Sequence, residues 1–120
     1  MRYMLLIYGP EPDMVPEGAS APDNEPWIAY TRSLVEQGIH RGGEPLAQTS
    51  SATSVRVRDG RRVVTDGPYA ETKEVLGGYY ILECEDLDTA LDAAASCPGA
   101  LYGTVEVRPL AEMPGLGEAG

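Results

Sequence analysis

The sequence predicts an α+β fold of the ferredoxin-like kind, with an antiparallel sheet and one inserted hairpin. Apolar runs of strand length alternate with two segments of helical periodicity, in the order strand, helix, strand, hairpin, strand, helix, strand. In the N-terminal and the C-terminal half of the sequence, the two strands are separated by at least the dozen or so residues that a βαβ crossover needs. The 120 residues suit one domain, and a hydrophobic share of 42% is enough for a core. We expect this domain over residues 1–110 and a flexible C-terminal tail over residues 111–120.

The chain is predicted to open with a strand, a long loop and a helix. Residues 3–8 are nearly all apolar, which is typical of a strand buried on both faces or between helices and a partner. Residues 9–24 include four prolines, so we expect a loop that serves as a lid or a covering flap. Residues 25–37 predict a helix whose apolar stripe consists of Trp27, Thr31, Leu34 and Val35. Its ends are marked by Asn24 as the cap, Pro26 in the first turn and Gly38 as the stop.

Local patterns predict the remaining elements in the same way. They are an extended segment over 39–46, a polar loop over 47–52, a hairpin over 53–58 and 61–65, a strand over 78–83, a helix over 86–96 and a strand over 101–107. Asp59-Gly60 suits the type I′ turn of the hairpin, because both positions need a positive φ. Asp86 can cap the second helix, whose apolar stripe consists of Leu87, Ala90, Leu91 and Ala94.

This topology predicts a homodimer. Both helices would cover one face of the sheet, and the other face would carry Tyr3, Leu5 and Ile7 or the residues that alternate with them. An open apolar face of this size needs a cover. We therefore expect two copies to pack sheet against sheet.

Composition and charge restrict the classes of partner and the compartment. The net charge of −10 argues against nucleic acid, and the one tight basic cluster consists of Arg56, Arg58, Arg61 and Arg62 around the hairpin turn. The sequence has no apolar run of the roughly 18 residues that a membrane span needs and no signal-peptide pattern, so we expect a cytoplasmic protein without membrane partners. Cys84 and Cys97 form no CxxC pair and are predicted to be buried free thiols.

The loop over residues 66–74, DGPYAETKE, combines a turn, an aromatic ring and four ionisable groups. With this nonamer the chain resembles the YCII-related family, in the branch named for its DGPF motif. The resemblance extends from the opening MRYMLLIY through GEPL at 43–46, VRVRDG at 55–60 and LGGYY at 76–80 to VEVRP at 105–109. Tyr69 stands where the motif usually has Phe.

The resemblance implies a dimeric α+β-barrel fold, in agreement with the pattern of elements. Relatives in the wider group include dehydrochlorinases of aromatic-ring breakdown, and a His-Asp pair has been suggested as a site in some members. Proteins of the DGPF branch are often encoded beside extracytoplasmic-function sigma factors. The proline-rich loop over 9–24 departs from the usual spacing and can shape the entrance of a pocket.

The candidate catalytic residues are His40, Asp66, Glu71 and Lys73. His40 is the only histidine, and histidine is the natural proton shuttle at neutral pH. If its segment is extended, Glu44 points to the same face about 13 Å away, so the two can line one cavity without a direct hydrogen bond. Glu44, Tyr8 and Tyr69 are the candidate substrate-binding residues.

Structural roles compete with these assignments. Asp66 precedes Gly67-Pro68, where an aspartate often caps a turn, and the charged loop residues can simply be solvated. We find no phosphate loop, dinucleotide fingerprint, serine elbow or zinc spacing, and a single histidine makes a histidine-based metal site improbable. The sequence favours an enzyme that uses no cofactor and performs acid-base chemistry, such as elimination or isomerisation, on a small organic acid or ring compound. The alternative is a non-catalytic dimer that binds a small ligand or a partner and is linked to sigma-factor or stress signalling.

Overall fold

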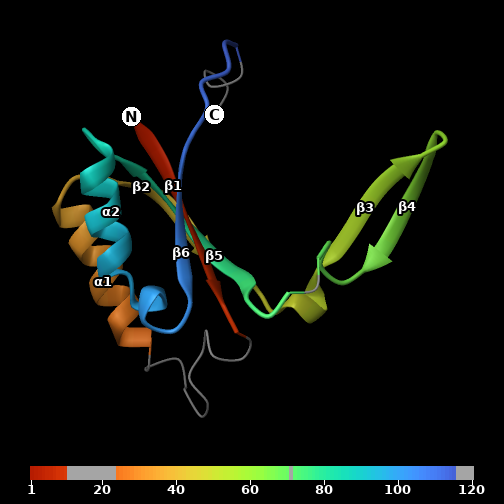
Figure 1. Ribbon diagram of the computed structural model, residues 1–120, viewed down its shortest axis with the longest axis horizontal. Coiled ribbons are helices and arrows are strands. Elements are labelled where there is room, and N and C mark those ends of the chain that lie inside the picture. Colours follow the sequence, from red (N-terminus) through yellow and green to blue (C-terminus); the bar gives the residue numbers. More distant parts are fainter. Residues whose placement is uncertain (11–23, 71, 116–120) are drawn as a thin grey trace.

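The computed structural model describes residues 1–10, 24–70 and 72–115. Its main body is an antiparallel four-stranded sheet in the order β2-β5-β1-β6, with two helices on one face (Figure 1). The elements of the body are β1 (Arg2–Gly9), α1 (Glu25–Glu36), β2 (His40–Pro45), β5 (Val75–Glu83), α2 (Leu87–Ser96) and β6 (Thr104–Pro109). Short 3₁₀ turns occupy Thr49–Ser51 and Pro98–Leu101. The predicted α+β, ferredoxin-like fold is confirmed.

The inserted hairpin, formed by β3 (Thr53–Arg58) and β4 (Arg61–Asp66), is a separate two-stranded sheet. It projects from the body on the side of the sheet away from the helices (Figure 1), and we call it the arm. Its turn has φ of 53° at Asp59 and 73° at Gly60, as the predicted type I′ turn requires.

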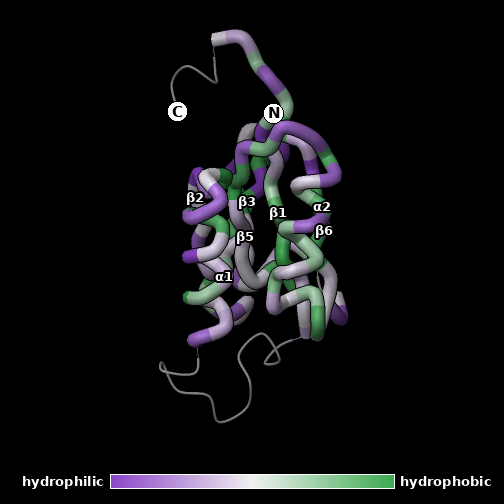
Figure 2. The backbone as a smooth tube through the Cα atoms, turned by 90° about the vertical axis from the view of Figure 1, so that its left-hand side faces the viewer, coloured by the Kyte–Doolittle hydropathy of each residue, from purple (hydrophilic) through white to green (hydrophobic). Residues whose placement is uncertain are grey.

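The core lies between the sheet and the helices. Tyr3, Leu5 and Ile7 alternate along β1 toward the helices, and each is at most 4% exposed. Tyr30 and Leu34 of α1 join them there. Figure 2 shows the hydrophobic stretches of β1 in the middle of the domain. Of the two alternating sets of side chains on β1, the one with Tyr3, Leu5 and Ile7 therefore faces the helices and not the open side of the sheet.

Some details of the helices differ from the prediction. Val35 is 57% exposed, and Tyr30 is buried instead, because the packed face of α1 is turned toward α2. On α2, Leu87 and Leu91 are exposed while Ala93 is buried, so small residues face the sheet. The side chain of Asn24 makes no capping hydrogen bond, whereas Asp86 accepts one from the backbone N–H of Thr89 at 2.9 Å, as predicted.

The structure also tests the predicted element boundaries, the ends of the first helix and the burial of the cysteines. The last strand begins at residue 104 rather than 101, because Leu101 belongs to a 3₁₀ turn. Strand β5 begins at residue 75 rather than 78, so the sheet resumes directly after the predicted loop over residues 66–74. Pro26 lies in the first turn of α1, and Gly38 follows the helix with φ of 76°, as expected for a stop. Cys84 and Cys97 are buried free thiols, as predicted.

The face of the sheet opposite the helices is largely apolar. Cross-strand partners share a face, so the register of β1 with β5 and β6 defines it. The apolar part of this open face consists of Met4, Leu6, Tyr8, Leu76, Tyr79 and Ile81, with Glu44 on β2 at one margin and Thr104, Glu106 and Arg108 on β6 at the other. The edge strands β2 and β6 both end in a proline, Pro45 and Pro109. No helix among the described residues is long and apolar enough to cross a membrane.

Candidate functional site

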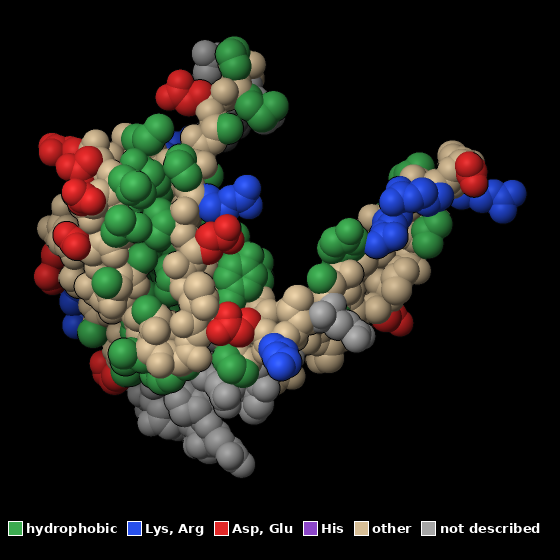
Figure 3. Space-filling model, in the orientation of Figure 1, with side chains coloured by type: hydrophobic (Ala, Val, Ile, Leu, Met, Phe, Trp, Pro, Cys, Tyr) green, Lys and Arg blue, Asp and Glu red, His purple; other side chains and the backbone are tan. Residues whose placement is uncertain are grey.

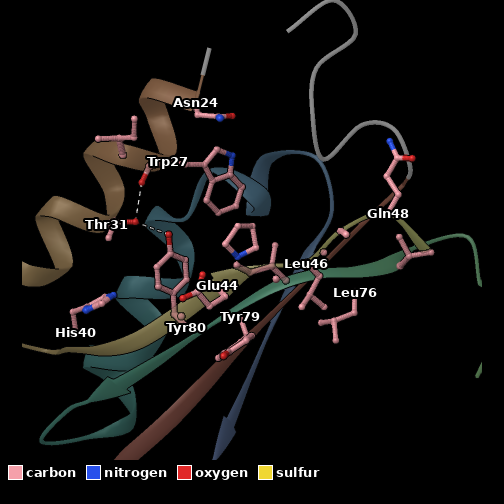
Figure 4. Close-up of a pocket in the computed structure, with 18 of the residues that line it drawn as sticks. Asn24, Trp27, Thr31, His40, Glu44, Leu46, Gln48, Leu76, Tyr79 and Tyr80 are labelled. Atoms are coloured by element: carbon pink, nitrogen blue, oxygen red, sulfur yellow. Dashed lines mark hydrogen bonds between the residues drawn. The ribbon is translucent and has the colours of Figure 1, made fainter. Parts of the chain in front are cut away.

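A cavity of about 890 Å³ lies between α1 and the strands β2 and β5 (Figure 4). Its walls combine aromatic and aliphatic side chains with a few polar groups. The lining includes the side chains of Trp27, Ile28, Thr31, Arg32, His40, Leu46, Leu76 and Tyr80, together with those of Asn24, Glu44 and Gln48. A concave, mostly apolar site with convergent polar groups is the usual setting for a small-molecule ligand.

A chain of hydrogen bonds joins α1 to the wall formed by β5. The Thr31 hydroxyl donates to the backbone carbonyl of Trp27 at 2.9 Å and lies 2.7 Å from the Tyr80 hydroxyl (Figure 4). A threonine has one hydroxyl hydrogen, so Thr31 accepts the hydrogen bond and Tyr80 donates it. The remaining lone pair of the Tyr80 oxygen is then available to accept a hydrogen bond from a ligand.

Tyr80 is held in its neutral form. Its burial raises the pKa of the phenol above the ordinary value, and this outweighs the opposing effect of the hydrogen bond to Thr31. At neutral pH the Tyr80 hydroxyl is therefore protonated and can both donate and accept a hydrogen bond. Its ring packs edge-on against Tyr30 with the ring centroids 5.4 Å apart, which fixes its direction.

His40 lies at the start of β2, beside Tyr80. The two rings meet edge to face with their centroids 6.1 Å apart. The register with β5 shifts between His40 and Gly42, and the Arg41 guanidinium donates to the carbonyls of Gly38 and His40 at this point. This bulge turns His40 toward the helix side of the sheet, where the cavity lies.

The bulge also places the side chains of His40 and Glu44 on different faces of the sheet. Both line one cavity, as the spacing predicts. However, His40 pairs with Leu82 of the core face, whereas Glu44 pairs with Tyr79 of the open face. The prediction that the two side chains share a face is therefore wrong, because one extra residue in the strand reverses the alternation.

Two glycines keep the cavity wall closely packed. A Cβ at Gly43 would lie 2.6 Å from the backbone oxygen of Tyr79. A Cβ at Gly99 would lie 2.7 Å from Cγ2 of Ile7 and 3.2 Å from Cη2 of Trp27. All three distances are shorter than ordinary contacts, so these positions need glycine for close approach.

The loop over residues 66–74 divides between the arm and a second, smaller cavity of about 540 Å³. Tyr8 and Tyr69, two of the predicted substrate-binding residues, line this second cavity, with Pro68, Thr72 and Glu74 beside them. Leu46, Ala47, Gln48, Val75 and Leu76 line both cavities, so they form the wall between them. Tyr69 is 79% exposed, and its ring lies 5.0 Å from the Arg56 guanidinium carbon.

The other predicted catalytic residues are not brought together with His40. Asp66 ends β4 in an exposed position, and Lys73 is exposed; neither lines these two cavities. Glu71 lies outside the described residues, as does most of the predicted lid over 9–24. At the turn, the Gly67 N–H donates to the Ala52 carbonyl at 2.7 Å, and the described residues offer the Asp66 carboxylate no hydrogen bond.

Sequence reasoning did not place Trp27 and Thr31 in the site, and it favoured a packing role for Tyr80 over a hydroxyl that meets a ligand. Trp27 and Thr31 fall within the predicted apolar stripe, and Tyr80 lies in a strand, where aromatic residues usually serve packing. The signal that was available is that Trp27 and Thr31 are four residues apart and hence on one side of a helix. The described residues contain no group of three or more His, Cys, Asp or Glu side chains arranged to hold a metal ion.

Comparison with known proteins places the chain in a family. A family model described as the YCII-related domain matches residues 1–114. The chain belongs to the YCII-related family. This YCII-related protein is 38% identical over 117 residues to an uncharacterised protein of Rhizobium meliloti (strain 1021), covering 92% of this chain and 93% of that one.

A solved structure has a similar fold. It is the 5-chloro-2-hydroxyhydroquinone dehydrochlorinase TftG from Burkholderia phenoliruptrix AC1100, in complex with 2,5-dihydroxybenzoquinone. The TM-score is 0.52 at 15% identity, and the match covers 94% of this YCII-related protein and 96% of TftG. At this identity the likeness shows the fold and not the reaction.

Proposed function

We propose that this YCII-related protein is an acid-base enzyme that acts on a small ring compound or organic acid by elimination or isomerisation, using its own side chains. One observation carries the proposal. The cavity of about 890 Å³ combines an aromatic and aliphatic lining with the only histidine of the chain. A flat ring gains from the apolar walls, and a histidine can move a proton at neutral pH.

The contacts of the site suggest a role for each polar group. Tyr80, whose own hydrogen is donated to Thr31, accepts a hydrogen bond from a hydroxyl of the substrate. His40, beside the Tyr80 ring, accepts the proton that the substrate loses. In an elimination, the electron pair of the broken bond to hydrogen forms the new double bond, and the leaving group departs with its bonding pair. Arg32, which also lines the cavity, favours the departing anion.

Ligand binding can be followed without a label. Trp27 is the only tryptophan of the chain and lines the cavity, so its fluorescence reports on the occupied site. We suggest 2,5-dihydroxybenzoquinone as the first probe and chlorinated hydroxyhydroquinones as the first substrates, because TftG is similar in fold. Binding is expected to change the Trp27 emission and to saturate.

The decisive comparison is between His40→Gln and Glu36→Gln. His40→Gln should lower turnover by roughly 10²- to 10⁴-fold while ligand binding persists, because glutamine cannot take up the proton. Glu36→Gln, at the exposed end of α1 and outside the cavity, should leave turnover unchanged. Full turnover in His40→Gln would contradict the proposal. If Asp66→Asn or Lys73→Gln instead removed activity, the chemistry would belong to the loop over residues 66–74.

A non-catalytic role is the second candidate. The donor of Tyr80 is already used by Thr31, and the cavity walls are mainly apolar, as in a simple ligand-binding site. Such a protein could link a small ligand to stress signalling through a partner. Saturable binding without turnover, unaffected by His40→Gln, would favour this candidate over the enzyme.

We also propose that the protein is a homodimer in which the open faces of two copies pack against each other. Its central residues on β1 and β5 are apolar and partly exposed, and no described element covers them. Two copies that pack open face to open face would remove this surface from water. Sedimentation equilibrium measures this directly. Leu6→Lys, in the middle of the open face, should produce monomers with native circular dichroism.

A further inference from the structure

The arm has two chemically different faces. Partners across the hairpin share a face, and residues two apart along a strand do so as well. One face therefore carries Val55, Val57 and Val64, which we call the valine face, with Arg62 opposite Val57 and Thr53 and Asp66 at the base of the arm. The other carries Arg56, Arg58, Arg61 and Val63. A hairpin that was only a solvated loop would need no apolar side.

Nothing in the described part of the same chain covers the valine face. Val55, Val57 and Val64 are 59%, 62% and 52% exposed, and all six residues of β4 are exposed. The radius of gyration is 16.2 Å, whereas a compact chain of this length has about 13.6 Å. An isolated two-stranded hairpin is marginally stable in water, so the arm needs a surface to pack against.

The distribution of charge along the chain indicates which surface the arm packs against. Residues 53–66 contain four arginines and two aspartates, which gives the arm a net charge of +2. The net charge of the whole chain is −10, so the residues outside the arm sum to −12. Four of the nine Lys and Arg residues lie in the arm, and Figure 3 shows them toward its tip, whereas Asp and Glu side chains are spread over the body among a few basic ones. The arm is thus complementary in charge to the body of another copy of the same chain.

Shape supports the same partner. A hollow separates the arm from the body, and the open face of the sheet lies on the arm's side of the body (Figures 1 and 3). A second copy that covers the open face enters this hollow. At the base of the arm, the contact between Arg56 and Tyr69 ties the arm to the loop over residues 66–74.

We propose that the valine face of the arm packs against a second copy of the chain, so that each copy of the homodimer is clasped by the arm of the other. This inference rests on the dimer proposed above and adds an intersubunit role for the arm. It also gives the loop over residues 66–74 a task, because that loop connects the arm to the wall shared by both cavities.

The first test changes the valine face without changing the fold of the hairpin. The triple variant Val55→Thr, Val57→Thr and Val64→Thr keeps the β-branched shape and replaces an apolar methyl group with a hydroxyl. By sedimentation equilibrium we expect the dimer dissociation constant to rise about tenfold or more. Among single variants, Val55→Thr should raise it more than Val63→Thr, the matched change on the opposite face, which should alter it by less than about twofold. Equal effects of the two single variants would overturn the proposal.

The second test follows the arm in the unchanged protein. Amide hydrogen exchange of residues 53–66 is measured above and below the dimer dissociation constant. The arm amides should become protected when the dimer forms. A dimer whose arm amides exchange at the same rate as in the monomer would overturn the clasp and leave the dimer through the open face intact. A chain that remained monomeric at all concentrations would overturn both the clasp and the dimer. The proposed catalytic activity of the cavity is tested separately, by the turnover of His40→Gln.

Discussion

Replacing Tyr30 with phenylalanine tests the connection between the two helices. The Tyr30 hydroxyl donates to the Ala93 carbonyl of α2 at 2.6 Å, and Tyr30 is only 7% exposed. Tyr30→Phe keeps the ring in the core and removes only the oxygen. It leaves a buried carbonyl without its partner, so the free energy of unfolding should fall by about 1–2 kcal/mol at neutral pH.

The pH dependence of that difference has a definite sign. Burial is the main cause that raises the pKa of Tyr30, with smaller contributions from Cys97 and Tyr80. A phenol whose pKa is raised by folding stabilises the protein fully below the ordinary value of 10.0, and this stability is lost as the pH rises above it. Each further pH unit costs the wild type about 1.4 kcal/mol, while the phenylalanine variant has no such cost. The advantage of the wild type should therefore disappear by about pH 11.

Guanidinium unfolding at pH 8 and pH 11, followed by circular dichroism, measures both quantities. Tyr102→Phe is the matched control, because Tyr102 is 46% exposed and its hydroxyl has no hydrogen bond within the described residues. The control should change stability little at either pH. A wild-type advantage over Tyr30→Phe that stays the same at pH 8 and pH 11 would refute the reasoning about burial.

Three further changes test the packing, the helix cap and the site. Gly99→Ala should destabilise the fold by about 1–3 kcal/mol and shift the Trp27 emission, because the added methyl group has no room; an unchanged melt and spectrum would contradict this. The pKa of Asp86 is lowered by hydrogen bonds from the first turn of α2, so its stabilising effect is present above the ordinary value of 3.8 and lost as the pH falls through the lowered pKa. Asp86→Asn should thus give thermal melts that depend less on pH in acid than those of the wild type, and parallel curves would argue against it. Thr31→Val removes the hydroxyl that can donate to the Tyr80 phenolate after ionisation and that thereby lowers the pKa of Tyr80; ultraviolet titration should therefore show a tyrosine that ionises at higher pH than in the wild type.

The overall plan of the fold was predictable because periodicity is a local property. The alternating Val55 and Val57, the turn at Asp59-Gly60 and the cap at Asp86 each depend on a few neighbouring residues. The packed sides of the helices were less predictable. Val35 fits the helical stripe but faces water, since the position of α2 determines which side of α1 is buried.

The site could be predicted only in part. The distance along the chain correctly placed His40 and Glu44 at one cavity. It could not reveal the bulge after His40, which reverses the alternation along β2. Thr31 and Tyr80 are 49 residues apart in sequence, so their hydrogen bond results from the tertiary fold alone. The nonamer over residues 66–74 is continuous in sequence, yet its described residues are divided between the arm and the second cavity.

The prolines on the two outer strands restrict how the protein can grow into larger assemblies. A new strand that joined β2 or β6 would meet Pro45 or Pro109, which offer no N–H for pairing, and on β2 it would also meet the bulge. Continuous sheets that run from molecule to molecule are therefore disfavoured at both margins. The arm has two unprotected margins of its own, and its arginines repel a second arm laid alongside. Contacts between copies are therefore expected through faces of the sheet rather than through its edges.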